Sequence, residues 1–148
     1  MSHDHHDAPR NPPLAVVAVV TDARGRILMG RRGPEVAAPG RWSLPGGFVS
    51  FGEDPADALS REVAEETGLT ISAARLLDAS LNGADPAKPV VVLTYAVEVV
   101  GTAAPDDDLT ELGWFDLDAL PPLAFELDRE RIAQSVSGGT SHPGPGGS

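Results

Sequence analysis

Apolar residues gather in short runs along this chain, and segments rich in glycine, proline and charge separate the runs. The runs at 14–21 (LAVVAVVT) and 26–32 (RILMGRR) flank the turn sequence DARG, and this arrangement predicts a β-hairpin. The segment 41–47 (RWSLPGG) predicts a short strand that ends in a turn. Further strands are predicted at 74–82, 89–101 and 113–117.

The clearest helical segment is 56–67 (ADALSREVAEET), which is composed of good helix formers. Asp54 is a plausible N-cap, Pro55 suits the first turn, and Gly68 suits the position after the last turn. A short helix at 116–120 and a longer one at 125–136 are also predicted. The whole pattern predicts an α+β domain, with a mixed sheet and helices packed on it.

The two ends of the chain differ in composition from its middle. Residues 1–13 are polar and acidic, and residues 137–148 are rich in Gly, Pro and Ser, so both are predicted to be disordered tails. The range 14–136 between them contains no repeat and no linker, and 148 residues fit one domain.

Composition excludes several classes of protein. The chain has no cysteine, which rules out disulfides, thiolate nucleophiles and zinc–thiolate sites. A net charge of −11 argues against a nucleic-acid polymer as the partner, because phosphate backbones are bound by clustered Lys and Arg. The longest apolar run, 14–20, is too short to span a membrane, and the N-terminus lacks the pattern of a signal peptide. A cytoplasmic protein is therefore expected.

Negative charge is concentrated between Gly46 and Leu69, where six carboxylates accompany a single arginine. On a helix, Glu62, Glu65 and Glu66 share an arc of about 100° beside the apolar face. Like charges at i,i+4 repel, and the repulsion grows where burial reduces screening. This spacing favours a site for Mg²⁺, which takes carboxylate oxygens, although a solvated acidic face would have the same composition.

The segment 47–69 resembles the Nudix hydrolase family. Its box has a Gly, five residues, a Glu, seven residues, and then Arg-Glu-apolar-x-Glu-Glu-x-Gly-apolar. Every fixed position matches, and the matching residues are Gly47, Glu53, Arg61, Glu62, Val63, Glu65, Glu66, Gly68 and Leu69.

The resemblance implies the Nudix fold, an α/β/α sandwich, and a loop–helix–loop that holds divalent metal against a diphosphate. The implied metal ligands are Glu62, Glu65, Glu66 and the backbone carbonyl of Gly46. Mg²⁺ is the expected ion, with Mn²⁺ as an alternative because both prefer oxygen ligands. Arg61 is expected to orient the glutamates through ion pairs.

Several neighbouring residues have supporting roles in this interpretation. Glu53 is expected to pair with Arg61, and Gly47 and Gly68 are expected to allow close approach or a positive φ. The resemblance leaves the identity of the general base open, because family members use either a box glutamate or a carboxylate from a distant loop. Glu111 is the best distant candidate here, and it competes with the acidic run 106–108.

Three residues outside the box are candidates for contact with substrate. Arg31 and Arg32 lie in a local basic cluster and are candidates to bind phosphate, while a plain surface role explains them equally well. Trp42 has an aromatic ring that can stack on a base, although core packing is the alternative.

The segment 114–132 (WFDLDALPPLAFELDRERI) is similar to Nudix members that hydrolyse ADP-ribose and related nucleoside diphosphate derivatives. The predicted reaction is therefore cleavage of a pyrophosphate linkage that yields AMP and a sugar phosphate. One alternative is a nucleoside triphosphate pyrophosphohydrolase, including 8-oxo-dGTP sanitation. Another is a non-catalytic nucleotide-binding regulator. The family often dimerises, so a homodimer is a further possibility for this chain.

Overall fold

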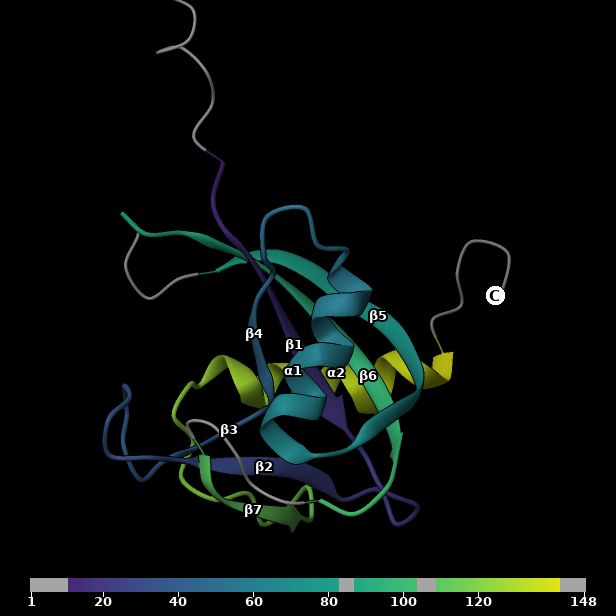
Figure 1. The fold of residues 1–148 in the computed structure, drawn as a ribbon. Helices are drawn as coiled ribbons and strands as arrows, with labels where there is room; N and C mark the ends of the chain where they lie inside the picture. The colour runs from purple at the N-terminus through teal and green to yellow at the C-terminus, as the bar shows by residue number, and fades with distance from the viewer. Residues whose placement is uncertain (1–10, 83–86, 104–108, 142–148) are drawn as a thin grey trace, which may run out of the picture.

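The computed structural model describes residues 11–82, 87–103 and 109–141. Within these residues the chain forms two β-sheets and two helices (Figure 1). The first sheet has the order β4 (Gly46–Phe48), β1 (Leu14–Val20), β6 (Val90–Val100), β5 (Thr70–Asn82). The second has the order β3 (Trp42–Ser43), β2 (Ile27–Arg32), β7 (Leu109–Phe115). The helices are α1 (Pro55–Thr67) and α2 (Leu127–Ser141).

Strand β1 lies in the middle of the four-stranded sheet. It runs parallel to β6 and antiparallel to β4, so the predicted mixed sheet is confirmed. Nearly every residue of β1 is apolar, and a strand of this kind needs cover on both faces. The two helices provide that cover, one on each face (Figure 1).

Alternate residues of β1 point to two separate apolar clusters. Val16, Ala18 and Val20 pack with Leu59 and Val63 of α1. On the other face Val17 and Val19 pack in a cluster that includes Ile132 of α2, together with Ile27, Met29, Leu44 and Leu123. This period-two alternation explains how a strand of seven residues connects both halves of the core. The predicted α+β sandwich is confirmed.

The predicted hairpin between 14–21 and 26–32 is wrong. A single antiparallel bridge joins Thr21 to Ile27, and beyond it β1 and β2 diverge into different sheets. Both runs are apolar enough to need two neighbours each. Each strand therefore takes a central place in its own sheet instead of pairing along its length with the other.

Other boundaries shift by a few residues. The segment 41–47 forms two short strands, β3 and the start of β4, which belong to different sheets. The predicted helix at 116–120 is a turn, because two prolines follow it directly and disfavour helical geometry. Helix α2 continues to Ser141, past its predicted end at Val136.

The division into tails and a central domain remains a prediction. Residues 1–10 and 142–148 lie outside the described part of the chain, as do residues 83–86 and 104–108. Among the described residues, no helix is both long and apolar enough to cross a membrane.

Candidate active site

The acidic segment forms the β4–α1 unit, and its helix begins and ends where the sequence predicts. The side chain of Asp54 accepts a hydrogen bond from the Ala56 amide at 2.8 Å, which makes Asp54 the N-cap. Gly68 adopts a left-handed conformation with φ 76°, and its amide donates to the Ala64 carbonyl. Ala58, Leu59, Val63 and Thr67 are buried, which fixes the rotation of α1 against the sheet.

Arg61 is the centre of a network of hydrogen bonds. Its guanidinium binds Glu53 through two bonds of 2.9 and 3.0 Å, so the predicted ion pair is present. Nη1 of Arg61 also donates to Glu62 at 3.0 Å and to Glu65 at 3.3 Å. A further bond from Nη2 reaches the Phe48 carbonyl at 3.2 Å. Arg61 therefore ties the helix to the loop that precedes it and restrains two glutamates.

The backbone of β4 lies directly against two glutamates. A Cβ atom on Gly47 would come within 2.3 Å of Oε2 of Glu62, so a larger residue here would displace this carboxylate from its observed position. The amide of Gly46 donates to Oε1 of Glu66 at 3.1 Å. Glu62 and Glu66 also interact with each other through their side chains. The structure thus brings these two carboxylates together at Gly46–Gly47.

The electrostatics of the site follow from this arrangement. Burial raises the pKa of Glu62, whose side chain is 14% exposed, and the charge of Glu65 adds to the effect while Arg61 opposes it. In contrast, the bonds from Arg61 and from the Ser50 amide lower the pKa of Glu53 to about 2. Glu62 and Glu66 are thus two adjacent carboxylates in one partly buried site, and the guanidinium of Arg61 balances their negative charge.

The third predicted ligand, Glu65, is placed differently. Its side chain is 47% exposed and turns to Arg61. Within the described ranges, no three His, Asp or Glu side chains lie close enough together to hold a metal ion. Two carboxylates still fit Mg²⁺, which is commonly bound through one or two carboxylates together with water and substrate phosphates.

The candidates outside the box lie on the three-stranded sheet. Glu111 faces Arg31 across β2 and β7, with 3.7 Å between the charged groups. Its described ion pair is therefore with Arg31. The competing acidic run 106–108 lies outside the described residues.

Arg32 and Trp42 have structural contacts. Nε of Arg32 donates to the Ala37 carbonyl, and its guanidinium lies 5.0 Å from the centre of the Phe125 ring. Trp42 packs edge-to-face on Phe115 with ring centres 5.0 Å apart, and both partly buried rings lie against the apolar cluster that includes Ile132 of α2. For Trp42 the geometry favours core packing over base stacking.

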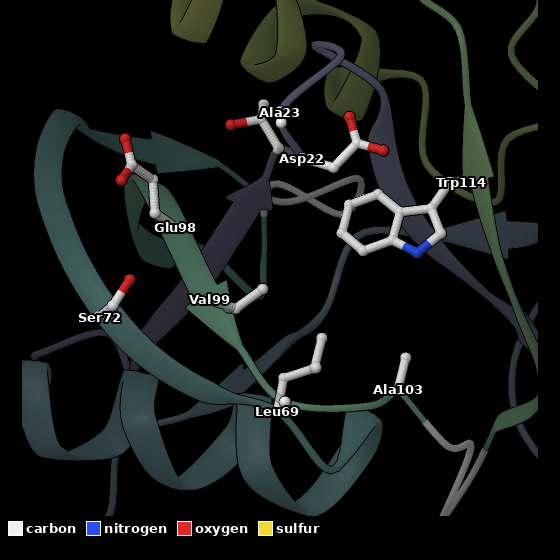
Figure 2. Close-up of a pocket in the computed structure, with 10 residues that line it drawn as sticks. Asp22, Ala23, Leu69, Ser72, Glu98, Val99, Ala103 and Trp114 are labelled. Atoms are coloured by element: carbon white, nitrogen blue, oxygen red, sulfur yellow. The ribbon is translucent and has the colours of Figure 1, made fainter.

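A hollow of about 470 Å³ that the sequence did not reveal lies at the ends of β1 and β6 (Figure 2). Figure 2 shows Asp22, Glu98 and Trp114 around it, with Leu69 and Val99 forming an apolar part. None of the four glutamates of the box is among its described lining residues. The carboxylates of Asp22 and Glu98 disfavour the binding of a phosphate in this hollow. No local pattern signals this hollow, because strand ends far apart in the sequence form it.

Comparisons with known proteins agree with this geometry. The family model described as "NUDIX domain" matches residues 11–136. An ADP-ribose pyrophosphatase of Methanocaldococcus jannaschii is 36% identical over 124 residues, which is 82% of this chain and 71% of that protein. An NAD-capped RNA hydrolase, NudC, of Pseudomonas aeruginosa is 34% identical over 119 residues. That match covers 80% of this chain and only 41% of NudC.

Solved structures share the fold. A MutT NUDIX hydrolase from Burkholderia pseudomallei superposes with a TM-score of 0.74 at 31% identity, covering 84% of this chain and 98% of that one. The NUDIX domain of Shewanella oneidensis NrtR, solved with ADP ribose, has a TM-score of 0.74 at 23% identity. The coverage is 90% of this chain and 92% of the NrtR chain, and at this identity the likeness concerns the fold alone.

Proposed function

This chain belongs to the NUDIX hydrolase family, and we propose that it cleaves the pyrophosphate linkage of a nucleoside diphosphate derivative with the help of Mg²⁺. ADP-ribose is the leading candidate substrate, because a relative that carries this activity in its name is 36% identical over most of the chain. The cytoplasm is the location we expect for this reaction.

One observation carries the proposal: Glu62 and Glu66 are held side by side against the Gly46–Gly47 backbone. Their oxygens, with Glu65 and the Gly46 carbonyl, are the ligands we assign to the cation. Arg61 restrains Glu62, and the Gly46 amide restrains Glu66, so both carboxylates are positioned before substrate arrives. Such preorganisation is what a site needs to stabilise charge in a transition state.

The proposed reaction is a hydrolysis at phosphorus. A bound divalent cation would neutralise the diphosphate oxygens and stabilise the leaving phosphate. Water adds to one phosphorus, the bond from that phosphorus to the bridging oxygen breaks, and ADP-ribose gives AMP and ribose 5-phosphate. Glu111 is our candidate to accept the proton of the water. Arg31 and Arg32 are candidates to bind substrate phosphate.

Two other functions are alternatives to this one. The alternative in the same reaction class is a nucleoside triphosphate pyrophosphohydrolase, which releases a monophosphate and pyrophosphate. The alternative of another class is a regulator that binds a nucleotide without cleaving it.

The test is a product assay on the purified chain with Mg²⁺ and then with Mn²⁺. The panel contains ADP-ribose, other nucleoside diphosphate sugars, nucleoside triphosphates and 8-oxo-dGTP, with NAD and NAD-capped RNA added because of the NudC relatives. AMP with ribose 5-phosphate supports the proposal. Pyrophosphate with a monophosphate moves the chain to the triphosphate group, and ligand-induced thermal stabilisation without product supports the regulator.

The Glu66→Gln variant tests the assignment of Glu66 as a metal ligand. We expect kcat/KM to fall at least about 100-fold, because loss of a metal ligand exceeds the usual effect of its supporting groups. Glu130→Gln, at an exposed position of α2, is the control and should leave turnover unchanged. Equal activity in both variants, with both folded by circular dichroism, would contradict the assignment.

A further inference from the structure

The hollow at the ends of β1 and β6 has two chemically different walls (Figure 2). One wall is aromatic and apolar, and it consists of the half-buried Trp114 of β7 together with Leu69 and Val99. The other wall carries the carboxylate of Glu98 and the hydroxyl of Ser72. Figure 2 shows Trp114 and Glu98 on opposite sides of the hollow. The volume of about 470 Å³ lies in the range of small-molecule sites, so a ligand with an apolar body and polar ends suits this hollow.

A β-bulge brings Ser72 to the hollow. In the pairing of β5 with β6, Ile71 lies opposite Val99 and Ala73 lies opposite Glu98, which leaves Ser72 as the extra residue. A bulge changes the direction of a side chain, and bulges are frequent beside binding and active sites. The strand therefore departs from regular pairing at the point where it passes the hollow, and it adds a hydroxyl to the wall that carries Glu98.

The charge of Glu98 is not balanced within the described part of the chain. Glu98 is exposed, and its side chain makes neither an ion pair nor a hydrogen bond with any described residue. Its carboxylate is therefore free to accept hydrogen bonds from a ligand. An anion would be repelled here, whereas a cation would find a charged acceptor beside an apolar wall.

The carboxylate of Asp22, by contrast, is largely satisfied. It accepts hydrogen bonds from the Arg24 amide at 2.9 Å, from the Arg26 amide at 2.8 Å and from Nε of Arg26 at 2.8 Å. Because a carboxylate offers about four lone-pair sites, Asp22 retains room for one more donor. Arg26 also balances the charge of Asp22, so Glu98 is the principal acceptor of the hollow and Asp22 is a secondary one.

These walls select an aliphatic ammonium ion over other ligands. An ammonium group donates to a carboxylate and a hydroxyl, and it is also attracted to the face of an indole ring. The methylene groups of such an ion pack on apolar side chains, as the stem of a lysine does. A neutral aromatic base could stack on Trp114, but it would cover Glu98 without supplying the positive charge that compensates for lost hydration.

We propose that this hollow binds a linear aliphatic polyamine. One ammonium group lies at Glu98 and Ser72, the methylene groups pack on Leu69 and Val99, and a further ammonium group lies at the face of Trp114. This binding goes beyond the proposed hydrolysis. None of the four glutamates of the box lines the hollow, so the two sites are tested separately.

The experiment is a titration with putrescine, the four-carbon diamine, at constant ionic strength, followed by ¹H–¹⁵N NMR. The chain has two tryptophans, and a Trp114→Phe variant assigns their indole N–H signals. We expect the Trp114 signal to shift until it saturates and the Trp42 signal to stay in place, because Trp42 packs against the other apolar cluster. Butanediol, which has the same chain length and no charge, should leave both signals unchanged.

The Glu98→Gln variant should raise the dissociation constant of putrescine about fivefold, which is the upper range for an exposed ion pair. Glu130→Gln is the matched control, since it makes the same change in net charge at an exposed position of α2 and should bind like the wild type. Binding is read without turnover, so the result holds whether or not the chain hydrolyses ADP-ribose. A Trp114 signal that putrescine does not move would overturn the proposal, as would equal affinity in the two variants. A shift caused by butanediol or by adenosine in place of putrescine would overturn it as well.

Discussion

At the scale of single residues, the two glycines of β4 differ in what surrounds them. A Cβ on Gly47 would meet the end of the Glu62 side chain, which is flexible and can move. A Cβ on Gly46 would come within 2.3 Å of the Val16 carbonyl, which belongs to the central strand. Gly47 therefore leaves room for the carboxylate of Glu62, and Gly46 allows β4 to pair closely with β1.

We therefore expect the two alanine variants to fail in different ways. Gly47→Ala should keep most of its stability and lose about 100-fold in kcat/KM, because a displacement near 1 Å of a reacting group has effects of that size. Gly46→Ala should lower the urea midpoint of unfolding, because the sheet backbone must shift to relieve the clash. Parallel measurement of turnover and urea unfolding checks both. If the Gly47→Ala variant retained full activity, the inference that Gly47 positions Glu62 would be wrong.

At the scale of elements, Asp128 joins α2 to the segment that leads into β4. This residue is buried, and its Oδ2 accepts a hydrogen bond from the Leu44 amide at 3.2 Å while Oδ1 accepts from Arg131 at 2.7 Å. Burial raises the pKa of Asp128, and these two bonds oppose that effect. Because Gly46 follows Leu44 by two residues, the C-terminal helix helps to hold the strand on which Glu66 rests.

The Asp128→Ala change should destabilise the fold by about 3–5 kcal/mol, since it leaves the buried Arg131 charge without a partner. Asp128→Asn keeps an acceptor for the Leu44 amide and should cost less. Adding Arg131→Met to Asp128→Ala should recover part of the loss, because the unpaired charge is then removed. Urea unfolding curves of the three variants test this order. Equal stability of the Asp128→Ala variant and the wild type would exclude Asp128 as an anchor of α2.

At the scale of the whole molecule, the balance of carboxylates sets the stability against pH. The folded-state pKa of Glu53, about 2, lies below its ordinary value of 4.5. Its pairing with Arg61 therefore stabilises the native state above pH 4.5, and that contribution disappears as the pH falls toward 2. The raised pKa values of Glu62 and Asp128 act in the opposite sense. Burial disfavours the charged forms of these two carboxyls, so their contribution to stability is greatest at low pH, where they are protonated, and is lost as the pH rises through their folded-state pKa values.

Glu53→Gln should consequently be less stable than the wild type at neutral pH, and the two proteins should converge in stability between pH 4.5 and about 2. The same variant should lose about 10–100-fold in activity, because Arg61 then no longer has the partner that orients it toward Glu62. Thermal unfolding over this pH range is the measurement. A stability difference that stays constant with pH would show that Glu53 acts through something other than its charge.

The sequence by itself determined the β4–α1 unit. Helix α1 begins after Asp54 and ends before Gly68 as predicted, and the motif that contains Arg61 and its glutamates identified the family. These features were predictable because caps, helix formers and i,i+4 spacing act between residues close in sequence. The apolar runs at β1 and β6 likewise predicted strands, and the order of strands and helices predicted a mixed sheet.

Only the tertiary structure decided which of these residues meet. It brought Glu62 and Glu66 against Gly46–Gly47, left Glu65 as the more exposed of the two glutamates on Arg61, and separated β1 and β2 into different sheets. The hollow beside Trp114 and the bulge at Ser72 arose in the same way. Each depends on hydrogen bonds or packing between segments tens of residues apart, and a local sequence pattern does not specify which distant segments will pair.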